Sequence, residues 1–162
     1  MTFELVKAMA LNAAREVGRG FTEPDDDWQP IALAMDAKGR GIFMVLDFGP
    51  ASETKQAFLE EVLPVLLREA GAVAVALVTS SWMLTFKGKR PAVLPRPSES
   101  PDREEVLIVS VVDRLRAEAQ IAPILRHPDR PPELGPWDVL PEDASFGGLV
   151  PETLRRALAP QG

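Results

Sequence analysis

Two strongly apolar segments, residues 72–86 and 106–112, place the tightest constraint on what this chain can fold into. Residues 72–78 read AVAVALV and residues 106–112 read VLIVSVV, so both segments are apolar at odd and even positions alike. A short apolar run of this kind predicts a strand that is buried on both faces. We therefore expect the two segments to be central strands of one sheet.

A long hydrophilic segment, residues 87–105, separates these two strands. Prolines interrupt it, bases are concentrated in its first half, and acids predominate in its second half. A loop of this length inside a compact domain is typically functional or disordered. Its basic half follows two aromatic residues and carries four positive charges with no acid among them. We therefore predict a contact site made of Trp82, Phe86, Lys87, Lys89, Arg90 and Arg96.

The N-terminal part of the chain reads as a helix followed by a hairpin. Apolar residues recur at helical spacing over residues 2–18, which predicts an amphipathic helix. Residues 29–35 alternate large and small apolar side chains, so we expect a strand with one well-buried face. A DAKGRG turn leads to residues 42–48, whose continuous apolar run predicts a strand covered on both faces. The two strands should form a β-hairpin.

A second helix is expected over residues 53–70, with Ser52 as its N-cap and Gly71 as its C-terminal stop. At 100° per residue its apolar side chains span about 200° of the helical wheel, more than one sheet face can cover. The terminal helices or a second subunit must therefore also pack against it. Pro64 falls on the polar side of the wheel with Glu60 and predicts a kink or a break.

The C-terminal third contains a fifth strand, an irregular segment and a short helix. Residues 117–125 alternate in polarity, and Pro123 favours an edge, a bulge or a strand end because proline cannot donate to a ladder. Residues 127–151 are proline-rich, and Pro151 opens the last helix. We expect residues 1–162 to form a single α+β domain. Its mostly antiparallel five-stranded sheet should carry helices on its faces, in the order α-β-β-α-β-β-β-α.

This element order resembles that of the roadblock and longin class of modules, in which a five-stranded antiparallel sheet carries its helices on the faces. The resemblance covers most of the chain and rests on element order, without a residue motif. It implies scaffolding or regulation of small GTPases through dimers. The long loop after the third strand and the proline-rich segment depart from that pattern, and a generic two-layer α+β domain fits the same order.

Composition excludes several chemistries. The chain has no cysteine, so disulfides, thiol catalysis and cysteine-based metal sites are absent, which fits a cytoplasmic protein. His127 is the only histidine, so one chain cannot build a two-histidine metal site. The sequence contains neither a P-loop nor a dinucleotide fingerprint, and we expect no cofactor and no metal. A net charge of −6 disfavours general nucleic-acid binding, and no apolar run is long enough to cross a membrane.

Three functional hypotheses follow. The first is a non-enzymatic interaction or regulatory module that binds a protein partner or itself as a homodimer, through the arc of helix 53–70 or a sheet edge. The second is a small acid-base enzyme or hydrolase that uses Asp36 and Asp47 with His127 or an arginine, although no motif assigns a catalytic residue. The third is phosphate or single-stranded nucleic-acid binding at the basic loop, with Trp82 and Phe86 as stacking faces.

Overall fold

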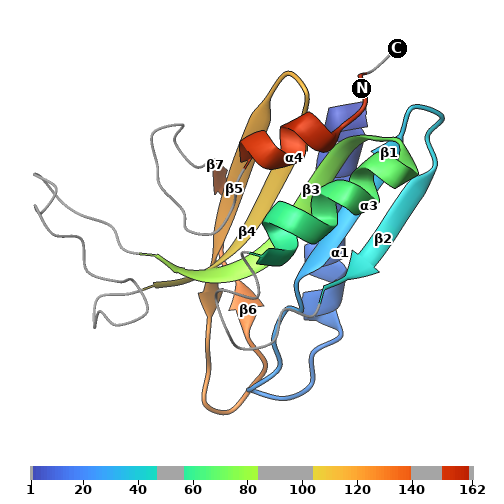
Figure 1. Ribbon diagram of the computed structural model, residues 1–162. Coiled ribbons are helices and arrows are strands. Elements are labelled where there is room, and N and C mark those ends of the chain that lie inside the picture. Colours follow the sequence, from blue (N-terminus) through green and yellow to red (C-terminus); the bar gives the residue numbers. More distant parts are fainter. Residues whose placement is uncertain (1, 47–56, 84–103, 140–150, 161–162) are drawn as a thin grey trace, which may run out of the picture.

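The computed structural model describes residues 2–46, 57–83, 104–139 and 151–160. These residues form a mixed α+β fold with helices on both faces of one curled antiparallel sheet (Figure 1), which confirms the predicted class. The elements in chain order are α1 (Thr2–Arg19), β1 (Ile31–Asp36), β2 (Gly41–Val45), the π-helix η1 (Phe58–Val62), α3 (Leu63–Ala70), β3 (Ala72–Met83), β4 (Glu104–Asp113), β5 (Ala117–Leu125), β6 (Glu133–Leu134), β7 (Asp138–Val139) and α4 (Pro151–Ala157).

Strands β3 and β4 form the middle of the sheet, as their apolar sequences predict. The strand order is β2-β1-β3-β4-β5-β6, and β7 also pairs with β5. β3 and β4 pair continuously from Ala74 opposite Asp113 to Met83 opposite Glu104. Residues 72–79 of β3 and 106–113 of β4 are all buried. The two strands therefore form the buried centre on which both helical layers rest.

The predicted number of five strands was wrong, because the described residues form seven. The additional strands β6 and β7 have two residues each and lie in the segment 127–151, which was predicted to be irregular. The amide of Gly135, directly after β6, donates a hydrogen bond to the Pro123 carbonyl over 2.8 Å. A β-carbon at Gly135 would lie 2.5 Å from Pro123 Cγ, so glycine is what permits this approach. Long-range backbone pairing thus gives residues 133–139 a regular course that the proline content of the segment did not indicate.

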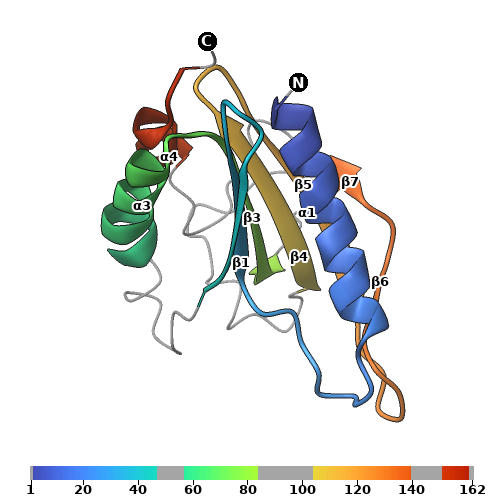
Figure 2. The ribbon, with the colours of Figure 1, turned by 90° about the vertical axis from the view of Figure 1, so that its right-hand side faces the viewer.

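Helix α1 covers one face of the sheet (Figure 2). Its buried residues recur every three or four positions, which confirms the predicted amphipathic helix. They pack against alternate residues of β1, β3 and β4, because successive strand residues point to opposite faces. The main contributors are Phe3, Val6, Ala10 and Ala14 of α1, and Leu33, Met35, Ala76, Val78 and Val109 of the sheet.

The opposite face is covered by η1, α3 and α4 (Figure 1). Within the described residues from 57 onward, the predicted helix 53–70 consists of a π-helical turn followed by an α-helix. This change of helix type agrees with the break predicted near Pro64. The expectation that Pro64 lies on the polar side was wrong, because Pro64 is buried in the first turn of α3. A π-helical turn advances by a smaller angle per residue than an α-helical one, so a uniform 100° step misplaces this residue.

The broad apolar arc of this helix is only partly covered. Leu59, Leu63 and Leu67 are buried, whereas Val62 and Leu66 remain exposed. The cover includes the C-terminal helix α4, as the sequence allowed. Its buried side chains in this cluster are Leu154, Ala157 and Leu158.

Strand β2 departs most from its prediction. The hairpin with β1 is confirmed, but β2 is the edge strand of the sheet and was wrongly expected to be covered on both faces. Its residues Ile42, Phe43 and Val45 are exposed. The apolar composition of a strand indicates that burial is favourable. It does not show how many neighbouring strands or helices will cover it. Here α1 packs over β1, β3 and β4, so β2 lies outside the strands that this helix covers.

Trp28 fixes the connector between α1 and β1. Its indole Nε1 donates a hydrogen bond to the Ala14 carbonyl over 2.9 Å, and its ring packs edge-on against Phe21. A β-carbon at Gly18 would lie 3.0 Å from Trp28 Cζ2, so a glycine makes room for the indole. The tryptophan thereby joins the end of α1 to the start of β1.

We expect Trp28→Phe to lower the free energy of unfolding by about 2 kcal/mol, because it removes a buried hydrogen bond and leaves a void. Urea unfolding followed by circular dichroism measures the change. Trp137→Phe is the matched control, because Trp137 is only partly buried. Equal losses in the two variants would contradict the role assigned to Trp28.

Candidate interaction surface at the sheet edge

The outer side of β2 carries backbone groups that no described strand pairs with. On the inner side, the Leu46 amide donates to the Pro30 carbonyl, and the Arg40 carbonyl accepts from the Asp36 amide. Backbone groups of alternate residues point to opposite sides of a strand, so residues 42 and 44 also face β1. The N–H and C=O groups of Gly41, Phe43 and Val45 therefore point outward. In the described part of the chain, no strand pairs with them.

The side chains of β2 are uncharged on both faces of this edge. Phe43 and Val45 lie on the α1 face, where they continue the row of Leu33 and Ile31, and they are 56% and 62% exposed. Ile42 lies on the α3 face and is 39% exposed. Edge strands are usually protected by charges, prolines or bulges that prevent pairing with other chains. The sequence Gly41–Val45 contains no charge and no proline.

The helices on the two faces of the sheet, α1 on one face and α3 on the other (Figure 2), carry further exposed apolar residues. Glu4 and Lys7 lie on the flank of α1 that faces β5, because Glu4 pairs with Arg116 and Lys7 pairs with Glu118. Leu5 and Met9 lie on the other flank and are exposed. We call seven exposed apolar residues, three on β2 and four on these helices, the edge surface. They are Ile42, Phe43 and Val45 of β2, Leu5 and Met9 of α1, and Val62 and Leu66 of the η1–α3 helix.

Val62 and Leu66 belong to this surface because of their position on the helix. They are four residues apart and share the flank opposite Pro64. Pro64 is buried, and α4 is the only other described helix that packs beside α3. Val62 and Leu66 therefore lie on the flank of the helix that points away from α4. Figure 1 shows α4 on one side of α3 and β2 on the other.

The turn before β2 is closed by Asp36. Its carboxylate accepts hydrogen bonds from the amides of Arg40 and Lys38 and from Arg40 Nε, each at 2.8–2.9 Å. The bond from the Arg40 amide is the main reason that the pKa of Asp36 lies below its usual value. Gly39 adopts a positive φ of 81°, which a glycine tolerates in this turn. The hairpin therefore fixes where β2 begins.

Most of the predicted contact site lies outside the described residues. This applies to Phe86, Lys87, Lys89, Arg90 and Arg96, whose role stays a prediction. The backbone of Trp82 is described and pairs with Glu105 at the end of the β3–β4 ladder. The assignment of residues 104 and 105 to the loop was wrong, because β4 begins at Glu104. Met83 pairs with Glu104, so the β3–β4 ladder extends to the residues on either side of the segment 84–103.

Arg126, directly after β5, forms hydrogen bonds and ion pairs with residues at the start of β4 and in the connector before β1. Its guanidinium binds Glu105 through two contacts, Nε–Oε1 at 2.7 Å and Nη2–Oε2 at 3.1 Å. It also donates to the Asp26 carbonyl at 2.9 Å and lies 3.0 Å from Asp27 Oδ1. The Glu105 contact is the main cause that raises the pKa of Arg126. One side chain thus joins the start of β4, the end of β5 and the connector before β1.

Arg126→Lys should loosen this junction, because an ammonium cannot reproduce two parallel hydrogen bonds to one carboxylate. We expect faster hydrogen exchange at the start of β4 and in residues 22–28, with about 1 kcal/mol less stability. Arg130→Lys is the control, because the ion pair of Arg130 with Glu133 is long, at 3.9 Å, and exposed. Unchanged exchange in Arg126→Lys would contradict this assignment.

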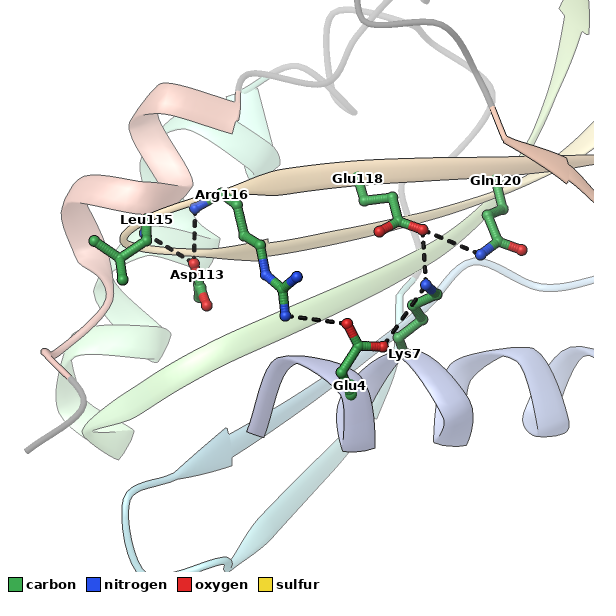
Figure 3. A network of polar contacts seen from close by, with 7 residues as sticks. All are labelled: Glu4, Lys7, Asp113, Leu115, Arg116, Glu118 and Gln120. Carbon is green, nitrogen blue, oxygen red and sulfur yellow. Dashed lines mark hydrogen bonds and ion pairs between the residues drawn. The ribbon is translucent and has the colours of Figure 1, made fainter. Parts of the chain in front are cut away.

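A second polar network joins α1 to β5 (Figure 3). Lys7 Nζ lies 2.8 Å from Glu118 Oε1, and this bond is the main reason that the pKa of Glu118 is lowered. Arg116 Nη2 lies 3.1 Å from Glu4 Oε1, and its guanidinium stacks 3.8 Å from the Phe3 ring centre. The charges pair with one another, so the network is suited to holding α1 in place and leaves no free acid or base among these groups.

Glu118 should contribute stability that depends on pH. A carboxylate whose folded pKa is lowered stabilises the fold above its unfolded pKa, and this stability is lost as pH falls through the folded pKa. We expect Glu118→Gln to cost at most about 1 kcal/mol at neutral pH, with the difference shrinking as the pH falls through the lowered pKa of Glu118. Denaturant titrations at several pH values measure it, with the exposed Glu69→Gln as control. A difference independent of pH would contradict the proposed charge contribution.

The residues considered for acid-base catalysis are not brought together. Asp36 lies beside Ala72 at one end of the sheet. His127 follows β5 beyond the pairing of Pro123 with Val106, at the other end. These ends are separated by roughly 30 Å, the length of about nine strand residues. Asp47 lies outside the described residues. Among the described residues, no group of three or more histidines and acids is placed to hold a metal ion.

No family model, no curated protein and no solved structure matches this chain. Among the described helices, none combines the length and the apolar character needed to cross a bilayer. The edge surface was not among the predicted site residues. The uncharged run of residues 41–46 is the relevant sequence feature, but the same feature fits a strand covered on both faces, so it does not by itself identify an edge.

Proposed function

We propose that this chain is a non-enzymatic interaction module that binds an additional β-strand at the β2 edge. The observation that supports the proposal is that no described strand pairs with the outward backbone groups of β2, whose apolar side chains Ile42, Phe43 and Val45 are exposed. Strand addition uses main-chain hydrogen bonds for affinity and alternate side chains for specificity. The β2 edge offers both, with Phe43 and Val45 on one face and Ile42 on the other.

The magnitude of the exposed area favours a binding surface. Between 37% and 62% of each of the seven residues is exposed. Together they present on the order of 500 Å² of apolar surface, in the range of patches that are often functional on monomeric proteins. The element order resembles roadblock and longin modules, for which a scaffolding or regulatory role in dimers is expected. The lack of cysteine fits a cytoplasmic setting for this role.

The other hypotheses have less support from the described residues. An enzyme built from Asp36 and His127 would need groups that lie at opposite ends of the sheet. Phosphate or nucleic-acid binding at Lys87, Lys89, Arg90 and Arg96 stays a separate prediction, for which salt-dependent affinity is the test.

A displayed library of nine-residue peptides tests strand addition. We expect immobilised protein at low density to enrich peptides with alternating apolar residues. An added strand places alternate side chains beside the exposed apolar residues of the edge strand. Val45→Lys should abolish enrichment by placing a charge at the edge. Leu115→Lys is the matched control, because Leu115 is 91% exposed in the turn between β4 and β5. Equal enrichment by both variants would exclude the β2 edge as the binding site.

A further inference from the structure

The β2 edge is complementary to a second copy of itself. The outward residues Gly41, Phe43 and Val45 are evenly spaced about Phe43, so a two-fold axis at Phe43 places Phe43 opposite its own copy. Gly41 then lies opposite Val45 of the other chain. In such an antiparallel pair, directly opposite residues with facing N–H and C=O groups exchange both hydrogen bonds. Every outward backbone group of both strands is thereby paired, which neighbouring registers do not achieve.

Charge also favours a second copy at this edge. Two chains that each carry a net charge of −6 repel one another, and this repulsion is weakest where both surfaces are neutral. All seven residues of the edge surface are uncharged. Two β2 strands can therefore pair over Gly41–Val45 without placing a charge between them, which would cost free energy.

The area of the edge surface suits a reversible dimer. Specific interfaces bury about 800 Å² on each partner, somewhat more than the apolar area of the edge surface, and smaller interfaces are typical of transient complexes. Six backbone hydrogen bonds would add to the apolar contact. A micromolar dissociation constant is therefore expected, with monomer and dimer both populated in an ordinary concentration series.

We propose that this protein forms a two-fold symmetric dimer in which the β2 strands of two copies pair antiparallel, with Phe43 opposite Phe43, to make one continuous sheet. This inference rests on the proposed strand addition at β2 and names its partner. The axis runs perpendicular to the sheet, so the α1 layers of both copies lie on one side and the α3 layers on the other. Ile42 of one copy faces Met44 of the second copy.

Charged substitutions at residue 43 test whether the two-fold axis of the dimer lies at Phe43. Sedimentation across a concentration series should show wild-type protein passing from monomer to dimer, whereas Phe43→Lys stays monomeric because two like charges then oppose each other. Phe43→Glu should also stay monomeric. A mixture of the two variants should recover the dimer, because opposite charges then meet at the axis. Leu115→Lys should dimerise as wild type does. Phe43 is 56% exposed in one copy, so these changes should leave the monomer folded.

Cysteine pairing tests the register, since the natural chain has no cysteine to interfere. Ile42→Cys mixed with Met44→Cys, with oxidised glutathione as oxidant, should give a disulfide-linked dimer. Opposed residues at such a position are about 4.5 Å apart between Cα atoms, within disulfide range. Each variant alone should link far less, because identical positions are then offset by two residues, about 8 Å apart. Ile42→Cys mixed with Leu115→Cys is the control.

The outcomes separate this inference from the proposed function. Heterodimer recovery in the charge-swap mixture together with the 42–44 cross-link supports the symmetric pairing. A dimer that survives Phe43→Lys and fails to form the cross-link overturns it. A strict monomer whose edge still enriches library peptides overturns the dimer and leaves strand addition standing. A strict monomer that enriches no peptide overturns both.

Discussion

The long antiparallel pairing of β3 with β4 is the interaction on which the rest of the structure depends. The ladder runs from Ala74 opposite Asp113 to Met83 opposite Glu104 and satisfies the backbone of the two most buried strands. Their side chains are apolar on both faces, so each face needs its own helical cover. α1 provides it on one side, and η1, α3 and α4 provide it on the other. The same ladder brings together the two ends of the segment between residues 83 and 104.

The two borders of this sheet are protected to different degrees. Beyond β4, the strand β5 pairs with β6 and β7, and Lys7, Glu118 and Arg126 form ion pairs along it. On the other side, β2 has one neighbour and an outer row of apolar side chains. Protection by charges and short strands is how sheets usually avoid pairing with other chains. The contrast within one sheet is the physical reason for assigning an interaction role to β2.

Much of the fold could be predicted from local patterns. The spacing of Phe3, Val6, Ala10 and Ala14 predicts α1, and the two apolar runs predict the central strands. The π-helical turn was not predictable from a uniform wheel, and the wheel therefore misplaced Pro64. The short strands β6 and β7 depend on partners in β5 that are distant in sequence. The site at the β2 edge was missed because a strand's own residues do not reveal what lies beside it.

The amino-acid sequence by itself determined the amphipathic helix α1, the buried central pair of strands and the absence of cysteine chemistry, because these follow from periodicity and composition over a few residues. Only the tertiary structure decided which apolar strand became the edge. Helices of finite width cover the middle of a sheet, and the strand left outside their reach keeps its hydrophobic side chains exposed. An apolar run is therefore buried in β3 and exposed in β2, since long-range packing alone assigns the neighbours of each strand.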